Sequence, residues 1–507
     1  MFVLARRIPS RTASLRRAPS LGALALSCGL VACGGAGSDD EGEGETGAEY
    51  EAPSDAWIDS DRSEFIDGAG RVRIFRGVNA RVEGVFDVTF DDGRERLEPV
   101  PDFGAEDAQQ IAALGFNLLR LPVNWSGIEP VRDSWDEAYL DRVEAVVDLC
   151  KAEGIYVIVD FHQDAYSKEI GEDGAPYWAI VPEPAEVHEG PLTAEDLEAA
   201  RTSLPVLRAF LSFFANDDDD PIDEELQAEF ADMAAHVAAR FADEPWVIGY
   251  EIFNEPVAED RYLVPFHAKV AQAIRTVDER HLLLFEPNAI RNLRDEAPLA
   301  QAPFSDAKGV YAPHLYTLAF SDPDGELATL EKSRLEQNFS NAERERASWQ
   351  TPMLIGEWGI GPTADNADNY TRWMYEYFDS YGWSAATWLW KENSQGRWGF
   401  YDYDDANDTW TPRPTVQGWH ARPWARAIGG RRQAMSWNPD TGIFELRFDG
   451  RADGAPSEIV WPGVAGSVEV FCDEVSVETR EIADGPAQIL ELSCGRDGSH
   501  TLRVERR

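Results

Sequence analysis

Cysteine, histidine and basic residues are all scarce in this chain of 507 residues, which has 5 Cys, 8 His and 46 Lys and Arg. The 92 Asp and Glu outnumber the basic residues twofold and leave a net charge of −46. A surface this acidic repels phosphate backbones and anionic lipid headgroups, so no nucleic acid partner is expected. The few cysteines and histidines form no group with zinc-site spacing, and the sequence predicts neither a metal site nor a cofactor.

Long hydrophobic runs are also missing near the N-terminus, where the apolar stretch 21–32 is too short to span a bilayer as a helix. It follows a segment with five arginines and no acidic residue, so residues 1–32 have the organisation of a secretory signal peptide. Its last residues, Leu30-Val31-Ala32-Cys33, resemble a bacterial lipobox, which implies that Cys33 is lipidated and becomes the mature N-terminus. An ordinary signal peptide cleaved nearby is the alternative.

Residues 33–56 are rich in glycine and acidic residues and predict a flexible linker. We therefore expect an exported monomer that is lipid-anchored to the bacterial outer membrane or cell surface, or else secreted. Its contact with a membrane would then be made only through the N-terminal lipid.

Beyond the linker, short β-branched or aromatic runs alternate with helical patterns, which predicts a parallel sheet. Eight such runs over residues 57–428 suit a (β/α)8 TIM barrel, whose active site lies at the C-terminal ends of its strands. A doubly wound open sheet is the alternative, but no glycine-rich phosphate loop follows the first run. The predicted strands are 74–80, 117–123, 156–162, 247–254, 282–287, 309–316, 352–359 and 384–390.

After residue 428 the helical patterns stop and only short strand-like runs remain, which predicts a small all-β sandwich over residues 429–507. Cys472 and Cys494 lie in two of these runs, and export favours a disulfide between them. Cys150 lies in a helical pattern and is interpreted as a buried free thiol.

Polar side chains gather at the predicted strand ends, where Glu255 follows the fourth strand and Glu357 the seventh. Two carboxyls across a barrel mouth can cleave a glycosidic bond, since one donates a proton to the leaving oxygen while the other attacks the anomeric carbon. Arg120 and Tyr316 would donate to Glu357 and keep it ionised. The 17 Trp, 15 Tyr and 24 Phe fit either core packing or a sugar-binding cleft.

Three further polar residues stand at strand ends. Asn254, beside Glu255, would hydrogen-bond a sugar 2-hydroxyl, and His162 and His314 would position the carboxyls or the sugar.

Five motifs follow the predicted strands in order, namely RGVN (76–79), GFNLLRLPVNWSGIEP (115–130), FNEP (253–256), HLY (314–316) and GEWG (356–359). Together they resemble glycoside hydrolase family 5. The resemblance implies a retaining mechanism in which Glu255 is the acid/base and Glu357 the nucleophile. It also implies that the first sugar subsite is lined by Arg120, His162, Asn254, His314, Tyr316 and Trp390.

Within this family the segments DFHQDAYSK (160–168), GAPYWA (174–179) and WKENSQGRWG (390–399) resemble the endoglycoceramidase branch. That branch cleaves between the oligosaccharide and the ceramide of glycosphingolipids, and the resemblance implies that Asp164 contacts the sugar and Trp178 walls the cleft. Two departures are Arg81, where the branch often has a lysine, and the segment Glu251-Ile252-Phe253 that precedes NEP.

The leading interpretation is therefore a retaining β-glycosidase that releases oligosaccharide from a glycolipid. A family 5 hydrolase acting on β-glucan or mannan is the nearest alternative. A non-catalytic surface lipoprotein that binds carbohydrate would have lost a catalytic glutamate or asparagine, and a structural surface protein would not need polar residues at every strand end.

The insertion 163–222 is expected to form a lid or a subsite wall. Its segment 204–214, LPVLRAFLSFF, is interpreted either as a helix packed on the barrel or as a wall for lipid tails. The acidic segments 216–220 and 402–408 lack the spacing of a calcium loop and are interpreted as solvated turns. The side chains expected to face lipid are Tyr177, Ile180, Phe210, Phe213 and Phe214.

Replacing Cys33 with alanine tests the lipid anchor. The variant should incorporate no labelled fatty acid, because the acceptor thiol is gone, and its specific activity after purification should match that of the wild type. Labelling equal to that of the wild type would exclude Cys33 as the acceptor.

Overall fold

The computed structural model describes residues 56–214, 224–293, 304–317, 319, 329–394, 398–404, 406–462, 468–482 and 487–506. The predicted signal peptide, Cys33, the linker and the acidic segment 216–220 lie outside these residues. None of the helices within them has both the length and the apolar composition that crossing a bilayer requires.

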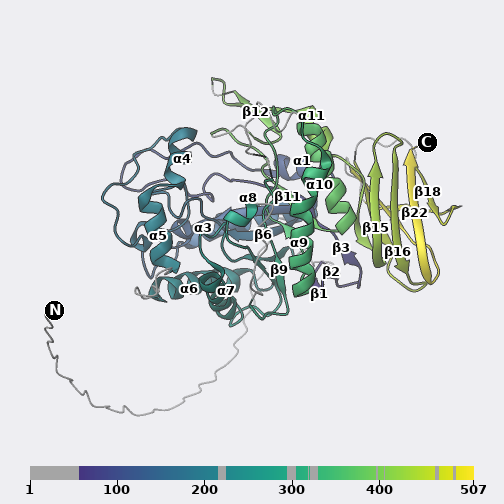
Figure 1. The fold of residues 1–507 in the computed structure, drawn as a ribbon, viewed down its shortest axis with the longest axis horizontal. Coiled ribbons are helices and arrows are strands. Elements are labelled where there is room, and N and C mark those ends of the chain that lie inside the picture. Colours follow the sequence, from purple (N-terminus) through teal and green to yellow (C-terminus); the bar gives the residue numbers. More distant parts are fainter. Residues whose placement is uncertain are drawn as a thin grey trace, which may run out of the picture. The chain divides into compact units, whose positions relative to one another are not determined.

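Eight parallel strands form a barrel in the order β10-β11-β4-β5-β6-β7-β8-β9, as predicted (Figure 1). A parallel bridge between Tyr311 and Met353 joins the first and last strands of this order and closes the barrel. Almost every strand residue is buried, because side chains fill the interior and helices cover the outside. The strands are β4 (Arg76–Asn79), β5 (Leu118–Val123), β6 (Tyr156–Phe161), β7 (Val247–Glu251), β8 (Leu282–Phe285), β9 (Gly309–Tyr311), β10 (Leu354–Ile355) and β11 (Ser384–Thr387).

Amphipathic helices connect these strands. In α3 (Glu137–Ala152), for example, the side chain of Asp136 caps the first turn by accepting the N–H of Tyr139, and the face that includes Cys150 is buried. Cys150 is a buried free thiol, as predicted, and burial raises its pKa. The other helices of the barrel are α1 (Ala105–Ala113), α2 (Trp125–Ile128), α6 (Glu224–Phe241), α7 (Asp260–Ile274), α8 (Ile290–Leu293), α9 (Glu336–Trp349), α10 (Ala367–Tyr381) and α11 (Pro414–His420), with a short 3-10 turn at Lys332–Arg334.

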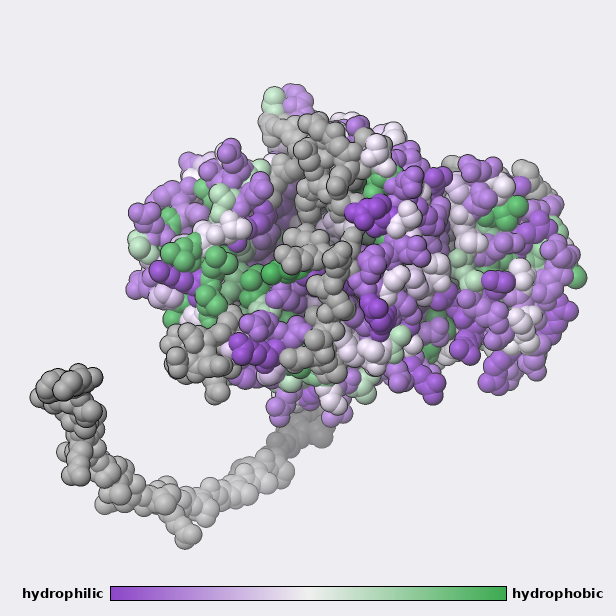
Figure 2. All heavy atoms as spheres, viewed as in Figure 1, coloured by the Kyte–Doolittle hydropathy of each residue, from purple (hydrophilic) through white to green (hydrophobic). Residues whose placement is uncertain are grey.

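The insertion after β6 contains a 3-10 turn (Tyr177–Ala179), α4 (Ala194–Arg201) and α5 (Leu204–Phe214). Phe213 and Phe214 are buried and pack edge to face on Phe266 of α7 at ring distances of 5.3 Å. Phe210 and Ile180 are buried as well. The prediction that these side chains face lipid is therefore wrong, and α5 packs on the barrel. Its outer side is apolar too, as Figure 2 shows.

Two antiparallel sheets share one hydrophobic core and form the predicted sandwich. The five-stranded sheet consists of β15 (Gly430–Asn438), β16 (Ile443–Gly450), β22 (Gly498–Arg506), β18 (Val468–Cys472) and β19 (Val475–Ser476). The seven-stranded sheet consists of β1 (Ile58–Asp61), β2 (Glu64–Asp67), β3 (Val72–Arg73), β14 (Trp424–Ile428), β17 (Ser457–Pro462), β21 (Ala487–Leu492) and β20 (Arg480–Glu481).

The seven-stranded sheet differs from the sequence-based division of the chain, because residues 58–73 and 424–428 belong to it rather than to the barrel. Buried ion pairs hold these segments together. Glu458 of β17 accepts from Arg71 at 2.5 Å and from Arg426 of β14 at 2.6 Å. After β11, a small hairpin of β12 (Tyr401–Asp404) and β13 (Thr409–Pro412) turns through the acidic segment, where Asp404 accepts the backbone N–H of Ala406.

Cys472, at the end of β18, forms a disulfide with Cys494, which follows β21, so the predicted bridge is confirmed and joins the two sheets. Reduction should lower the melting temperature of the protein, because opening such a bridge typically costs about 2–5 kcal/mol. Scanning calorimetry of the wild type and of Cys472→Ser/Cys494→Ser, with and without a phosphine reductant, measures this. Cys150→Ser is the matched control and should keep its sensitivity to reductant, whereas a double variant that melts with the wild type would contradict the prediction.

Candidate active site

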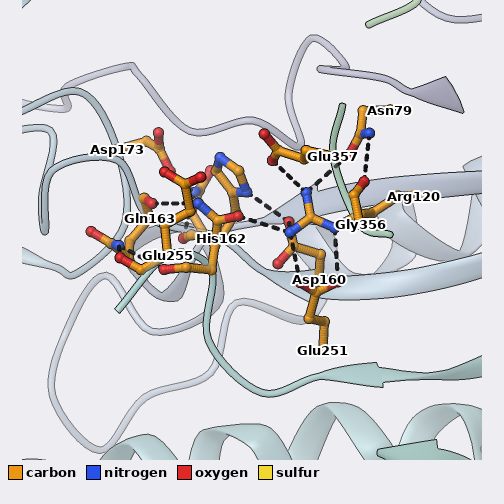
Figure 3. A network of polar contacts seen from close by, with 12 residues as sticks. Asn79, Arg120, Asp160, His162, Gln163, Asp173, Glu251, Glu255, Gly356 and Glu357 are labelled. Atoms are coloured by element: carbon orange, nitrogen blue, oxygen red, sulfur yellow. Dashed lines mark hydrogen bonds and ion pairs between the residues drawn. The ribbon is translucent and has the colours of Figure 1, made fainter. Parts of the chain in front are cut away.

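Arg120 of β5 is fully buried at the centre of a polar network (Figure 3). Its Nε and Nη2 donate to the two oxygens of Glu251 at 2.8 and 2.9 Å, and Nη1 donates to Glu357 at 2.7 Å. Burial opposes the charge, but the carboxylates raise the pKa of Arg120 well above its ordinary value. Arg120 also contacts Asn79, Asn254 and Asp160, and Glu286 lies 3.7 Å away.

The predicted hydrogen bond from Arg120 to Glu357 is thus present. Because Arg120 has no exposed surface, however, it does not line the subsite itself but acts on it through Glu357 and Asn254, which it contacts. Asn79 of β4 adds a second restraint, since its Nδ2 donates to the carbonyl of Gly356 at 3.0 Å and so fixes the residue before Glu357.

Glu357 follows β10 and its side chain is 7% exposed. Its other oxygen accepts from the hydroxyl of Tyr316 at 2.8 Å, as predicted. Burial raises the pKa of Glu357, while the charges on His314 and Arg120 oppose this rise. The two donors alone would lower the pKa of Glu357, but the effect of burial is larger and the pKa rises.

Glu255 follows β7, and its side chain is 31% exposed, so this carboxyl has contact with solvent that Glu357 lacks. Its backbone φ is +42°, in the left-handed region, and its N–H donates to Glu286 Oε1 at 3.1 Å. His314 Nδ1 lies 2.8 Å from Glu255 Oε1. One oxygen of Glu255 and one of Glu357 lie within 4.8 Å of each other.

His314 connects the two carboxyls with a buried acidic pair beneath them. Its Nδ1 is 3.6 Å from Glu357, and its Nε2 is 3.2 Å from Glu286 and 3.8 Å from Glu251. Burial opposes protonation of His314, but Glu286 and Glu357 raise its pKa well above the ordinary value. Burial also raises the pKa of Glu286, which lies at the end of β8. The surrounding carboxylates thus favour the protonated form of His314, whose Nδ1 faces Glu255.

His162 follows β6, and its Nδ1 lies 2.6 Å from Asp160. Burial opposes protonation, but Asp160 and Asp173 raise the pKa of His162 to about 9. The other side of the ring stacks on Trp388, with centroids 5.9 Å apart and an interplanar angle of 10°. Asn254 is fixed as well, since its Nδ2 donates to the carbonyl of Gln163 at 3.0 Å. An amide nitrogen has two hydrogens, so one remains for a sugar hydroxyl.

Asp164 and Trp178 lie further out on the insertion. Asp164 accepts a bidentate pair from Arg201 of α4 at 2.7 to 3.0 Å, and its side chain is 33% exposed. Trp178 is partly buried, packs edge to face on Trp125 and donates to the carbonyl of Glu129. Both retain accessible surface, and neither makes a contact with Glu255 or Glu357 that the structure records among the described residues.

Trp390 does not line the site as predicted. It is 1% exposed, and its Nε1 donates to Asp107 of α1 at 2.8 Å. The tryptophan that faces the site is Trp388, which is half-buried on His162. The strand β11 ends at Thr387, so the alternation expected of strand residues does not apply to either tryptophan.

Sequence reasoning also missed four groups around the carboxyls. Glu286 lies at the end of the fifth predicted strand, in LLLFEP, so its position at a strand end could have identified it from the sequence. Trp398, whose ring lies 6.2 Å from that of Tyr316, lies in the long connection after β11. Arg201 is the last residue of α4, and its pairing with Asp164 is apparent only from the structure. Asp160 lies inside a strand, where a buried acid is apparent only from its partners.

Two overlapping groups of oxygen and nitrogen atoms have the spacing of metal ligands, namely Glu255, His314 and Glu357, and Glu251, Glu286 and His314. Arg120 lies within 3.7 Å of Glu251, Glu286 and Glu357 and places a positive charge among them. A cation there would be repelled, so these residues suit proton transfer and nucleophilic attack better than metal binding.

Comparison with known proteins agrees with this site. The model of the family described as cellulase (glycosyl hydrolase family 5) matches residues 101–394. The chain is 25% identical to endoglycoceramidase I of Rhodococcus hoagii (strain 103S), over 89% of this chain and 88% of that protein. It is also 25% identical to an endoglycoceramidase of Cyanea nozakii, over 80% of this chain and 83% of that protein.

Among solved structures, the ganglioside GM3 complex of endo-glycoceramidase II from Rhodococcus sp. superposes with a TM-score of 0.73 and 26% identity. The match covers 88% of this chain and 100% of that one. The family match extends over more than half of this chain and includes every barrel strand from β5 to β11. The chain therefore belongs to the cellulase family, glycosyl hydrolase family 5, and is a glycoside hydrolase.

Proposed function

We propose that the protein hydrolyses the β-glycosidic bond between the oligosaccharide and the ceramide of glycosphingolipids, with retention of anomeric configuration. The observation that carries the mechanism is the spacing of Glu255 and Glu357, whose nearest oxygens lie within 4.8 Å. Retaining enzymes have carboxyls about 5–5.5 Å apart, whereas inverting enzymes need about 6.5–9.5 Å to admit a water.

In the first step Glu357 attacks the anomeric carbon and Glu255 gives its proton to the leaving oxygen. The different exposures of the two carboxyls suit these roles. Glu357 is held by Arg120 and Tyr316 in one orientation, which presents a fixed oxygen to the sugar. Glu255 reaches solvent and can recover its proton there.

In the second step Glu255 takes a proton from water, which attacks the anomeric carbon and breaks the ester to Glu357. Formation of that ester removes the negative charge of Glu357, which lies beside Glu255 and contributes to the raised pKa of His314. Glu255 therefore acts as the acid in the first step and as the base in the second.

The substrate class is supported by the relatives that match most of both chains, which are endoglycoceramidases. The ganglioside complex of a structural neighbour supports the same class. Trp388 and Trp398 offer half-buried rings beside His162 and Tyr316 for stacking on a sugar. We also propose export, with a lipid on Cys33, on the strength of the lipobox-like sequence alone.

Incubation with a ganglioside in detergent tests the substrate. Mass spectrometry should detect free oligosaccharide and ceramide with the wild type and neither with Glu357→Gln. Soluble β-glucan and mannan, tested in parallel, should be cleaved slowly or not at all. Rapid cleavage of a polysaccharide with an intact ganglioside would move the protein to the polysaccharide hydrolases of its family.

Removal of either carboxyl tests the two-step mechanism. Glu255→Gln and Glu357→Gln should each lose nearly all activity, by at least about a thousandfold, because proton transfer and attack each need an ionisable group. Azide should rescue Glu357→Gly by acting as the nucleophile, with a glycosyl azide of inverted configuration as product. The wild-type product should keep its configuration by NMR, and an inverted wild-type product would refute a covalent intermediate.

The raised pKa of Glu357 predicts the acid side of the pH profile. Attack needs the ionised carboxylate, so kcat/KM on a soluble aryl glycoside should fall as the pH decreases through a value above 4.5, the ordinary pKa of a glutamate. Tyr316→Phe removes one donor to the carboxylate and should move this fall to still higher pH. A profile that falls at the ordinary value in both proteins would contradict the prediction.

A further inference from the structure

Exposed hydrophobic side chains concentrate on the insertion after β6. The described residues include nine large hydrophobic side chains that are exposed, and five of the nine lie between residues 177 and 211. Figure 2 shows hydrophobic atoms gathered over α5. Such clustering on a protein with a net charge of −46 indicates a surface that contacts something other than water. The five are Tyr177, Val181, Leu204, Leu207 and Leu211.

Three of these side chains form one face of α5. Leu204, Leu207 and Leu211 are 57%, 42% and 50% exposed, and their spacing of three and four residues places them along the same side of the helix. The opposite side carries Phe210 and Phe213, which are buried in the barrel core. Packing on the barrel therefore explains only the inner side of α5, and the leucines of the outer side are not needed for it.

This outer face begins beside the active site. Arg201, three residues before Leu204, is paired with Asp164, and the carboxylates of Asp164 and, more weakly, Glu255 raise its pKa. Three residues span at most about 11 Å, so Leu204 lies close to the mouth of the barrel. The 3-10 turn that carries Tyr177 is tied to α5 by Tyr166, whose ring packs on Phe210 and whose hydroxyl donates to the carbonyl of Ala179.

We propose that the outer face of α5, with Leu204, Leu207 and Leu211, docks on the lipid surface that holds the glycolipid, so that the leucines enter its apolar region. This inference rests on the proposed function, since a ceramide with two acyl chains is presented in such a surface. The sequence suggested that the phenylalanines of α5 contact lipid. The proposal instead assigns the lipid contact to the leucines on the opposite face of the helix.

The charge of α5 supports a lipid occupant. The helix has no acidic residue, although acids outnumber bases twofold in the chain, and its only charge is the exposed Arg208. Leucines with a flanking arginine are typical of helices that lie in a membrane interface. A protein partner is disfavoured as the occupant of this face because the exposed area is small. The three leucines together expose less surface than two fully exposed leucine side chains, whereas a stable protein interface buries about 800 Å² per partner.

Vesicles of phosphatidylcholine without glycolipid provide the test, because binding to them needs neither the glycan site nor turnover. All proteins carry Cys33→Ala, which removes the lipid proposed for the N-terminus. The parent protein, with an unchanged α5, should cosediment with the vesicles. The variant Leu204→Ser/Leu207→Ser/Leu211→Ser should bind at least about tenfold more weakly, because its apolar face is lost. The single change Leu207→Asp should act in the same direction.

The matched control is Val277→Ser/Val475→Ser, which changes two exposed hydrophobic residues outside the insertion and should bind like the wild type. All variants should cleave a soluble aryl glycoside at the wild-type rate, which shows that they are folded. Equal vesicle binding by the triple variant, or no binding by the parent protein, would overturn the proposal. Sedimentation velocity showing a dimer that the triple variant loses would assign the face to a second copy instead. Ganglioside hydrolysis in detergent is scored separately and decides the proposed function.

Discussion

The buried positive charge of Arg120 is the constraint on which the rest of the site depends. A guanidinium with no access to water needs acceptors for its donors, and residues in or just after four strands of the barrel, β4, β6, β7 and β10, supply them. Two hydrogen bonds to Glu251 hold the planar guanidinium of Arg120 in one orientation. Its Nη1 therefore points in a fixed direction and holds the carboxylate of Glu357 there. Arg120 offsets part of the charge of these acids, and neighbouring carboxylates also raise the pKa values of His162 and His314.

The two functional carboxyls have different environments although they share His314. Glu357 lies on the inner side, where burial and fixed donors determine its orientation and its pKa. Glu255 is more exposed; its backbone is held by Glu286 in a left-handed conformation, and its carboxyl contacts His314. The side chain of Glu357 is thus fixed by two donors, whereas the more exposed carboxyl of Glu255 keeps contact with solvent.

The sequence predicted those features that depend on periodicity or on the position of a residue within a strand. All eight barrel strands, the sandwich, the disulfide and the placement of Glu255, Glu357, His314 and Tyr316 belong to this class. Features that depend on partners distant in sequence were not predictable. Trp390 and Trp388 could not be told apart because they lie beyond the last residue of β11, and the two faces of α5 could not be assigned because both are apolar. The short strands β1 to β3 gave no periodic signal, since they are too short and too polar to show one.

The pairing of β3 with β14 has a consequence for the order in which the chain folds. Arg73 and Ala427 are neighbours in the sheet, although more than 350 residues of barrel separate them along the chain. Contacts of such sequence separation form late, because the loop between them must close first. During synthesis the first strands of the sandwich therefore cannot complete their sheet until the barrel and the last eighty residues have been made. A nascent chain passes through a stage with an unpaired N-terminal sheet edge, which is the kind of surface on which chaperones act and from which misassembly begins.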